Sequence, residues 1–358
     1  MRFPYDTSYR DSRKLLRYGS DWLAYGILLA LLIGAPWILP RFYVGELTYL
    51  FIMSVASLGL MLLIGFTGQL SFGHAAFVAI GCYVHVWLLG HGVPLVASLL
   101  CAGLFTALVG LLIGLPAIRV SGLHLAMVTL AFSIIVEQVI GRWKDVTGGF
   151  TGLTVPRPLL FGFDLGGQRQ LYFLCLVVLV LVLLALVNLL RGHTGRAFTA
   201  IRDSEAAAQS LGIWTAGYKV FAFAISAGVT GVAGALLAHH VQYVTPEGFG
   251  LLLSLELVMM VVIGGLGSLR SAILGAIFIS LLPVAISALK PILPTRIGSQ
   301  FGLEIFVFGL MLALFILFEP AGLNGRWRKL KSLTDYFPLY RKDTFRRGKT
   351  YMRSERYR

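Results

Sequence analysis

Long apolar stretches without a charged side chain recur along this chain and limit its possible folds more than any other feature. Two of them are Leu171–Leu190 (LYFLCLVVLVLVLLALVNLL) and Phe221–Ala238 (FAFAISAGVTGVAGALLA). A helix needs about 20 such residues to cross the ~30 Å hydrocarbon core of a bilayer. Charged residues make up only 13% of the chain, whereas a soluble domain carries about 25%. We therefore expect an all-α polytopic membrane protein.

Ten apolar segments predict about ten transmembrane or re-entrant helices in a membrane domain at residues 22–318. The third and the eighth are short for full spans, so they either span or are broken or re-entrant with protein around their exposed backbone. The segments are Trp22–Leu39, Leu47–Ile64, Ala75–Leu89, Leu95–Ile118, Leu123–Ile140, Leu171–Leu190, Tyr218–His240, Leu251–Ile263, Ala272–Leu289 and Phe301–Phe318.

The distribution of positive charge predicts how these helices are oriented. Basic residues collect on the cytoplasmic side of membrane proteins. We therefore expect the tails at 1–21 and 319–358 and the loop at 191–217 to be cytoplasmic, and the Gly- and Pro-rich loop at 141–170 to be external. With this orientation, 23 of the 30 Lys and Arg residues lie inside. Because so much of the +14 net charge is in the tails, it favours membrane orientation and lipid contact over nucleic acid binding.

The stretch Gly195–Ile213 (GRAFTAIRDSEAAAQSLGI) is charged and rich in alanine, although apolar segments lie on both sides of it. Its apolar and small residues recur at three- and four-residue steps, which predicts a short amphipathic helix, bent near Asp203, with Gly212 as its stop. A small-residue face suits close docking, so we expect Ala207 and Ala208 to face another protein. The alternative is a helix lying on lipid, but the stretch lacks the Lys-rich face and aromatic anchors that such helices favour.

A second unusual segment, Gly65–Phe77 (GFTGQLSFGHAAF), interrupts an apolar run with glycines and polar residues. Unwound backbone inside a membrane is tolerated where it lines a cavity, which makes this segment a candidate translocation path. Glu256 is a further path candidate, because a carboxylate in the middle of a membrane segment is costly and usually functional. Its neighbour Ser254 is a candidate together with it. The path candidates are Gly68, Ser71, Gly73, His74, Ser254 and Glu256.

The sequence contains no motif that predicts enzyme chemistry. Cys82, Cys101 and Cys175 lie in apolar segments without metal-type spacing, and the histidines lack the spacing of metal sites, so we infer no metal. The tail sequence DTFRRGKT has Asp343 where a phosphate-binding loop needs its first glycine. We expect a transport subunit without its own ATPase site or cofactor.

Several stretches of the chain, taken in order, resemble the inner-membrane permeases of ABC importers in the branched-chain amino acid (LivM-like) group. They are GFTGQLSFGHAAFVAIGCY from Gly65, GLPAIRVSGLHLAMVTLAF from Gly114, VTGGFTGL from Val146, GRAFTAIRDSEAAAQSLGI from Gly195, KVFAFAISAGVTGVAGALLA from Lys219, VIGGLGSLRSAILGA from Val262 and EPAGLNGRWRK from Glu319. Together they cover roughly residues 43–329.

The resemblance implies a permease of the bacterial inner membrane, with both termini cytoplasmic. It implies pairing with a related second permease, two ATP-binding cassette ATPase subunits that bind the ATP, and an external substrate-binding protein. It also implies that the loop at 191–217 docks into an ATPase subunit. The residues assigned to this coupling are Gly195, Arg196, Ile201, Arg202, Asp203, Glu205, Ala207, Ala208 and Gly212. Glu205 stands one residue away from its place in the general ABC pattern, so its role is open.

The resemblance favours branched-chain or other apolar amino acids as substrates, and related permeases handle urea, amides or aromatic acids. Two other classes of protein fit the sequence less well than the importer does. A stand-alone secondary transporter or channel explains the spans but not the charged internal helix, and carboxylates for proton coupling are few. A membrane-embedded enzyme lacks a nucleophile, a base or a metal cluster.

Overall fold

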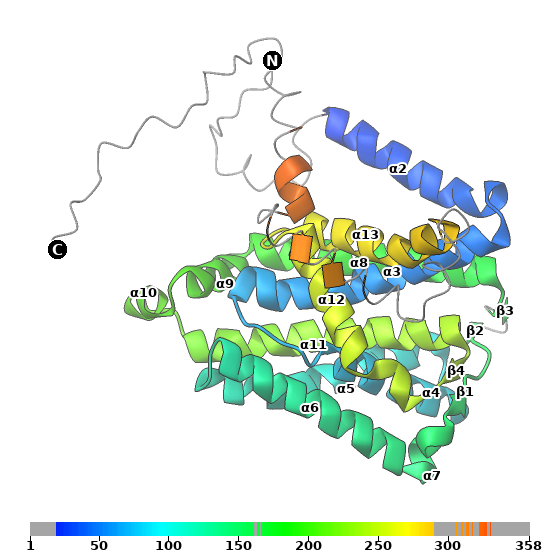
Figure 1. The fold of residues 1–358 in the computed structure, drawn as a ribbon, viewed down its shortest axis with the longest axis horizontal. Coiled ribbons are helices and arrows are strands. Elements are labelled where there is room, and N and C mark those ends of the chain that lie inside the picture. Colours follow the sequence, from blue (N-terminus) through cyan, green and yellow to red (C-terminus); the bar gives the residue numbers. More distant parts are fainter. Residues whose placement is uncertain are drawn as a thin grey trace.

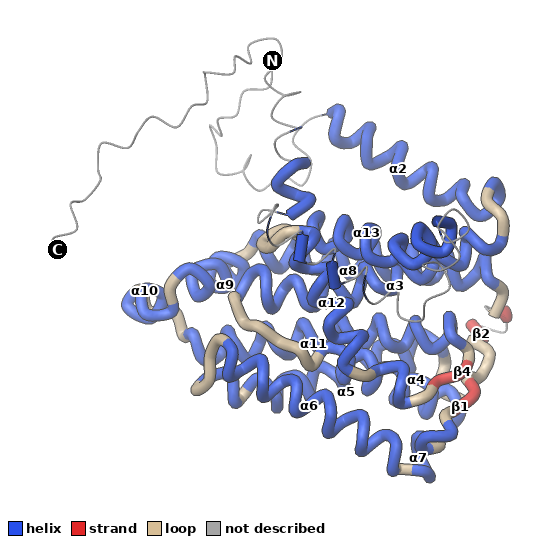
Figure 2. Tube along the Cα trace, viewed as in Figure 1, coloured by secondary structure: helices blue, strands red, loops and turns tan. Residues whose placement is uncertain are grey.

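The computed structural model describes residues 19–160, 163–164 and 166–289, together with 306, 309–310, 313–314, 317, 322–327 and 330. These residues form a helical bundle with two small two-stranded sheets (Figure 2). Its long helices are α2 (Gly19–Ile38), α3 (Arg41–Met61), α4 (His74–Gly90), α5 (Leu95–Gly114), α6 (Leu123–Arg142), α8 (Gln168–Arg191), α11 (Thr215–Val241), α12 (Leu251–Gly264) and α13 (Leu269–Leu289). The predicted fold class is confirmed.

The first nine predicted apolar segments are helices, and the tenth, Phe301–Phe318, lies mostly outside the described residues. Seven described helices are long and apolar enough to cross a membrane, whereas α2 and α4 contain shorter apolar helices. The prediction that the helix from Leu95 continues to Ile118 is wrong. It ends at Gly114, and a separate 3-10 turn, η2 (Pro116–Ile118), follows. The reason is Pro116, which has no N–H to continue the helical hydrogen bonds.

Helices α3 and α11 form the centre of the bundle (Figure 1). In the most apolar window of α3, extended by the π-helical turn η1 (Leu62–Phe66), 89% of residues are buried within the chain. The corresponding fraction is 28% for α6 and for α8. Because both of these helices are apolar on nearly all sides, their uncovered surface is suited to lipid or to another membrane protein.

Glycines allow the central helices to approach one another closely. A Cβ atom added at Gly81 of α4 would meet the backbone of Gly231 of α11, and one added at Gly59 of α3 would lie 2.8 Å from the carbonyl oxygen of Ser226. Small residues at such contacts bring backbones together and give membrane helices their packing energy. The glycine-rich side of α11 is therefore a packing surface.

The two long loops lie at opposite ends of the bundle (Figure 1). One end carries α9 (His193–Asp203) and α10 (Glu205–Ser210). The other carries α7 (Lys144–Thr147), η3 (Gly149–Thr151), β1 (Leu153–Thr154), β2 (Leu159–Leu160), β3 (Phe163–Asp164), β4 (Tyr243–Val244) and η4 (Pro246–Phe249). There, β1 pairs antiparallel with β4, and β2 with β3. The charge distribution requires the loops at 141–170 and 191–217 to lie at opposite ends. Which end is cytoplasmic stays a prediction.

A larger side chain at Gly81 should destabilise the bundle, because it would force α4 away from α11. We expect Gly81→Leu to lower the free energy of unfolding by about 1–3 kcal/mol, the usual cost of overpacking. Gly90→Leu, at the exposed end of the same helix with open space around it, should have little effect. Melting temperatures of the purified variants in detergent test this, and equal stability of the two would contradict the packing described above.

Single cysteines should report the two ends of the bundle from opposite sides of the membrane. Asp145 and Ser204 are both exposed, one at each end. In a background without Cys82, Cys101 and Cys175, we expect Asp145→Cys to react with an impermeant maleimide in intact spheroplasts. Ser204→Cys should react only after the cells are opened. Labelling of both variants from outside would contradict the predicted orientation.

Candidate functional site

The chain leaves helical geometry between α3 and α4. After the turn η1, the segment Thr67–Gly73 runs without regular helix from the α9 end of the bundle toward the start of α4 (Figure 1). Much of it is buried, so its backbone must find partners inside the protein. Gly68 N–H and Gln69 N–H donate to carbonyl oxygens of η1 at 3.2 Å, and Phe72 N–H donates to Thr129 Oγ1 of α6 at 3.0 Å.

His74, the first residue of α4, stands at the centre of a buried polar cluster. Ser226 Oγ of α11 donates to the carbonyl oxygen of Gly59 at 2.6 Å, so its oxygen accepts from His74 Nε2 at 2.8 Å. The remaining ring nitrogen, Nδ1, then accepts from Ser71 Oγ at 3.0 Å. These contacts fix one neutral tautomer of His74 and join α3, α4 and α11.

The start of α4 is tied to two further helices. Ala75 N–H donates to Ser254 Oγ of α12 at 3.1 Å. Gly73 lies against α6 so closely that a Cβ atom there would be 2.6 Å from the carbonyl oxygen of Thr129. Four of the six path candidates from the sequence, Ser71, Gly73, His74 and Ser254, are therefore brought together. All four are buried in this conformation.

The other two path candidates do not join this cluster. Gly68 is exposed, has a left-handed backbone with φ 71°, and lies next to Arg202 of α9. Glu256 is half-buried and stands two residues after Ser254 on α12. Because residues i and i+2 of a helix do not face the same side, its carboxylate points away from the His74 cluster.

The predicted amphipathic helix is two helices that meet at Ser204. Ser204 has an extended backbone and caps α10, since its Oγ accepts from Ala207 N–H at 3.3 Å. The predicted stop is confirmed: α10 ends at Ser210, and Gly212 has the left-handed φ of 79° that follows such an end. The bend expected near Asp203 is thus a full break with its own N-cap.

One face of α9 is packed against the membrane helices. Gly195 lies against the backbone of Leu190, and Phe198 and Ile201 are buried. The Phe198 ring meets the ring of Tyr218 of α11 edge-on, with centroids 6.1 Å apart. Arg196 points to the opposite, exposed side. This helix is anchored to the bundle by its own apolar side chains.

The two alanines of α10 differ in exposure. Ala208 is buried within this chain, whereas Ala207 is exposed. Of the two, Ala207 alone offers a surface to another protein. Two large side chains just after α10 are also exposed, Leu211 at 78% and Trp214 at 76%. The exposed surface from Ala207 to Trp214 is called the α10 face below. It has a small side chain, Ala207, at one end and large apolar side chains at the other.

Arg202 and Glu205 make their contacts inside the chain. Arg202 Nη1 donates to the carbonyl oxygen of Gly65 in η1 at 3.0 Å, and Arg202 also pairs with Asp203 at 3.0 Å. Glu205 pairs at 2.6 Å with Lys219, a buried residue in the second turn of α11. The sequence singled out the acid but not its partner Lys219, although Lys219 is the one charged residue near the start of an apolar helix.

Arg202 and Glu205 thus join the α9–α10 unit to the rest of the bundle. Across the residues that the structure describes, no three His, Cys, Asp or Glu side chains gather as a metal ion would require.

Comparison with known proteins identifies the class. The chain belongs to the family described as branched-chain amino acid transport system / permease component, whose model matches residues 42–317. It is thus a multi-pass membrane permease of the ABC transporter type. The family expected from the sequence is confirmed.

Individual relatives carry more specific names. The LivM permease protein of the high-affinity branched-chain amino acid transport system of Escherichia coli is 37% identical over 278 residues, 70% of this chain and 65% of the relative. The LivM of Salmonella typhimurium is 34% identical over 335 residues, 85% and 76% of the two chains. A probable LivH permease of Methanocaldococcus jannaschii is 28% identical over 304 residues, 81% and 94%. The chain covers just under two thirds of the E. coli relative, and no solved structure matches it significantly.

Removing the Ser226 hydroxyl should destabilise the protein, because it leaves His74 Nε2–H buried without a partner and removes the bond from the hydroxyl to the Gly59 carbonyl oxygen. We expect Ser226→Ala to cost about 1–3 kcal/mol of unfolding free energy. Ser54 of α3 is a matched control, since its Oγ is buried with no hydrogen-bond partner. Ser54→Ala should be neutral or stabilising. Thermal unfolding in detergent compares the two, and a Ser226→Ala protein as stable as Ser54→Ala would show that the cluster is unimportant for the fold.

Proposed function

We propose that the chain is a membrane subunit of an ABC importer that moves branched-chain or other apolar amino acids inward by alternating access. Separate ATPase subunits would bind and hydrolyse the ATP. The observation that carries this proposal is the α9–α10 unit. It lies at one end of the bundle, exposes the α10 face, and is joined to the central helices by the contacts of Glu205 and Arg202. A stand-alone transporter does not require a helical unit of this kind for contact with an ATPase.

The proposed assembly contains this chain, a related second permease, two ATPase subunits and an external substrate-binding protein in a bacterial inner membrane. Relatives named LivM and LivH support the pairing of two permeases. The apolar surfaces of α6 and α8 that this chain leaves uncovered would contact a neighbouring subunit or lipid. Both termini and the α9–α10 end would face the cytoplasm.

The α10 face is the proposed docking surface for the ATPase. Ala207 leaves room for a close contact, and Leu211 and Trp214 would bury their apolar area against the partner. An exposed tryptophan and leucine together are costly to leave in water, at about 25 cal/mol per Å² of apolar surface. The same two side chains also suit a lipid surface, so the test must separate these partners.

Force applied to α10 has two routes into the membrane. One is the Glu205–Lys219 pair, which leads directly into α11. The ammonium group of Lys219 is buried, so separating it from its carboxylate would leave a charge without a partner, which costs several kcal/mol. The second route runs through Arg202 to the carbonyl of Gly65, where α3 gives way to the unwound segment. A rigid-body movement of α9–α10 would therefore displace α11 and the Thr67–Gly73 segment together.

Bulk at Ala207 should uncouple transport without damaging the membrane fold. We expect Ala207→Trp to assemble with its sister permease but to lose the ATPase subunits or to hydrolyse ATP without moving solute, since overpacking a contact typically costs about 1–3 kcal/mol. Pull-down of the complex and ATP-driven leucine uptake into proteoliposomes measure this.

The control is Ala97→Trp, an exposed position on α5, which should assemble and transport almost normally. A lipid-lying α10 would tolerate or favour a tryptophan at Ala207. Full ATP-coupled uptake by Ala207→Trp would therefore reject α10 as the docking surface. Absence of any co-purifying ATPase from the unmodified protein would reject the importer itself.

A further inference from the structure

Gln69, in the unwound segment between α3 and α4, is a buried polar side chain without a partner. Only 5% of the residue is exposed, and neither the nitrogen nor the oxygen of its amide has a hydrogen-bond partner within the chain. Such an amide can donate two hydrogen bonds and accept two more. Because buried polar groups are nearly always hydrogen-bonded, the Gln69 side chain points to a bound molecule or ion that completes its contacts.

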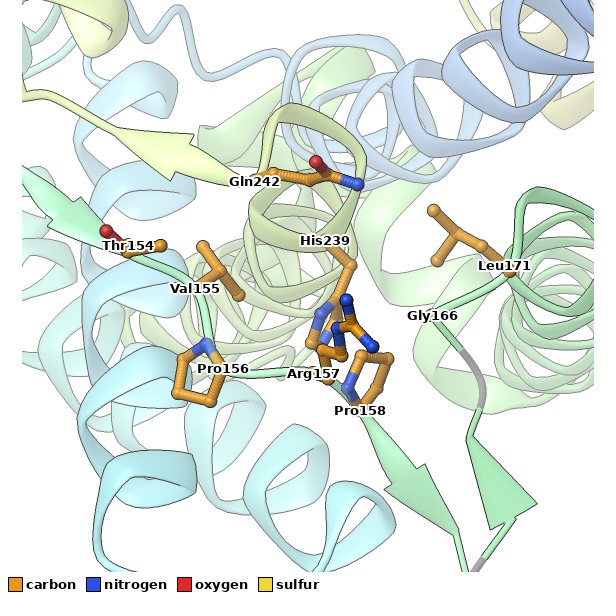
Figure 3. A pocket seen from close by; sticks show the side chains of 10 residues that line it. Thr154, Val155, Pro156, Arg157, Pro158, Gly166, Leu171, His239 and Gln242 are labelled. Carbon is orange, nitrogen blue, oxygen red and sulfur yellow. The ribbon is translucent and has the colours of Figure 1, made fainter.

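Gln69 lines a cavity of about 110 Å³ at the α9–α10 end of the bundle, called the α9 pocket below. Its walls come from the start of the unwound segment, the turn η2, the first turn of α6, the end of α9, and the starts of α10 and α11. A larger cavity of about 450 Å³ opens at the opposite end, among the short strands (Figure 3). Among the described residues, none of the buried side chains without a partner lines that larger cavity.

The volume of the α9 pocket limits what it can hold. One water occupies about 30 Å³ in the liquid, so the pocket has room for roughly three waters, or for one small ion with one or two waters. Sites for small organic ligands are larger, at about 300–1,000 Å³. An amino acid is therefore too large for this pocket, and the candidates are water and a small ion.

The charged groups around the α9 pocket favour an anion. Arg202, Lys219 and Glu205 line it, so the lining carries more positive than negative charge. Asp203 also pairs with Arg202, but its side chain is 68% exposed and it does not line the pocket, so water screens its charge. The Glu205 carboxylate already contacts the Lys219 ammonium group at 2.6 Å. A cation in the pocket would thus meet a carboxylate that is already paired.

The first turn of α6 adds further positive character. The N-terminus of a helix carries a partial positive charge, and its first N–H groups have no partner within the helix. At α6 no side chain caps this end, and no acidic residue lies in the first turn. The N-cap is Gly122, and a Cβ atom there would meet nothing within 4 Å, so the end of the helix is open. Gly122 and Leu125 both line the α9 pocket, which brings this helix end and the Gln69 amide to one cavity.

We propose that the α9 pocket binds one small monovalent anion, of the size of chloride, held by the Gln69 amide, the N-terminus of α6 and the positively charged lining. The anion accepts a hydrogen bond from Gln69 Nε2, and a water beside it donates to Gln69 Oε1. The bound anion joins α6 and the unwound segment to the α9–α10 unit. The site is formed by this chain alone, so anion binding does not depend on the importer function.

Anion-dependent melting of the full-length protein, purified in detergent, tests the site. Sodium chloride is compared with sodium gluconate at equal ionic strength, since gluconate is too large for the pocket. We expect chloride to raise the melting temperature by at least about 2 °C, the shift produced when a ligand is present at roughly five times its dissociation constant. The rise should grow with the logarithm of the chloride concentration, as binding at one site requires.

Two substitutions of Gln69 separate anion binding from other effects. Gln69→Leu removes the amide, so the chloride-dependent rise should be lost, and stability in gluconate should not fall because the unpaired polar atoms are gone. Gln69→Glu supplies its own negative charge, so chloride should no longer raise its melting temperature. The control is Ser133→Ala. Ser133 Oγ of α6 is likewise buried without a partner but does not line the pocket, so this variant should keep the whole chloride-dependent rise.

Three results would overturn the proposal. The first is equal melting of the unmodified protein in chloride and in gluconate, which would mean that the pocket holds water only. The second is a full chloride-dependent rise in Gln69→Leu or in Gln69→Glu, which would place the anion elsewhere. The third is loss of the rise in Ser133→Ala, which would assign it to the packing of α6. If Gln69→Leu does not fold, Gln69→Glu decides alone: loss of the rise supports the site, and its retention rejects it.

Discussion

The structure depends on one constraint, that no buried backbone group may be left without a hydrogen-bond partner in an apolar interior. Between α3 and α4 the chain is not regularly helical, and the constraint is met there by partners from other helices. Thr129, Ser226 and Ser254, from three different helices, supply the side-chain partners around the break. His74 occupies the centre because one nitrogen of its ring donates while the other nitrogen accepts. The unwound segment is thus stabilised by side chains of other helices in the bundle.

The same helix, α11, contacts the loop at 191–217 through Lys219 and the His74 cluster through Ser226. Lys219 and Ser226 are seven residues apart, which is two helical turns, so their side chains lie on the same face of α11. Close contacts with α3, α4 and α5 along its glycines hold α11 tightly in the bundle. In the proposed mechanism, a displacement at Glu205 would reach the start of α4 through this helix rather than through a flexible loop. This geometry unites the two sets of residues that the sequence assigned to coupling and to the path.

Periodicity and composition were sufficient to predict the helices, because a membrane span is a local property of about 20 residues. The order of motifs was sufficient to predict the family. Contacts between distant residues were beyond this reasoning. The burial of Ala208, the pairing of Arg202 with Gly65 and of Glu205 with Lys219, and the hydrogen bond between His74 and Ser226 all depend on which helices become neighbours. The split at Ser204 did have a local signal, since a serine followed by an acidic residue and alanines is a common N-cap.

Burial of α3 has a consequence for biosynthesis. Its Gly59 carbonyl is joined to a hydroxyl 167 residues later in the chain. While the ribosome is still producing the later helices, the Gly59 carbonyl of α3 has not yet met α11, and the Ser57 hydroxyl of α3 has not yet met the carbonyl oxygen of Ala272 on α13. Helix α8, with a mean hydropathy of 3.3 against 2.2 for α3, is stable in lipid as soon as it emerges. The newly made protein must thus keep its first helices soluble in lipid, or shielded by the insertion machinery, until α11 and α13 have been added. Its core then closes from the outside inward, with the most hydrophobic helices placed before the central pair meets.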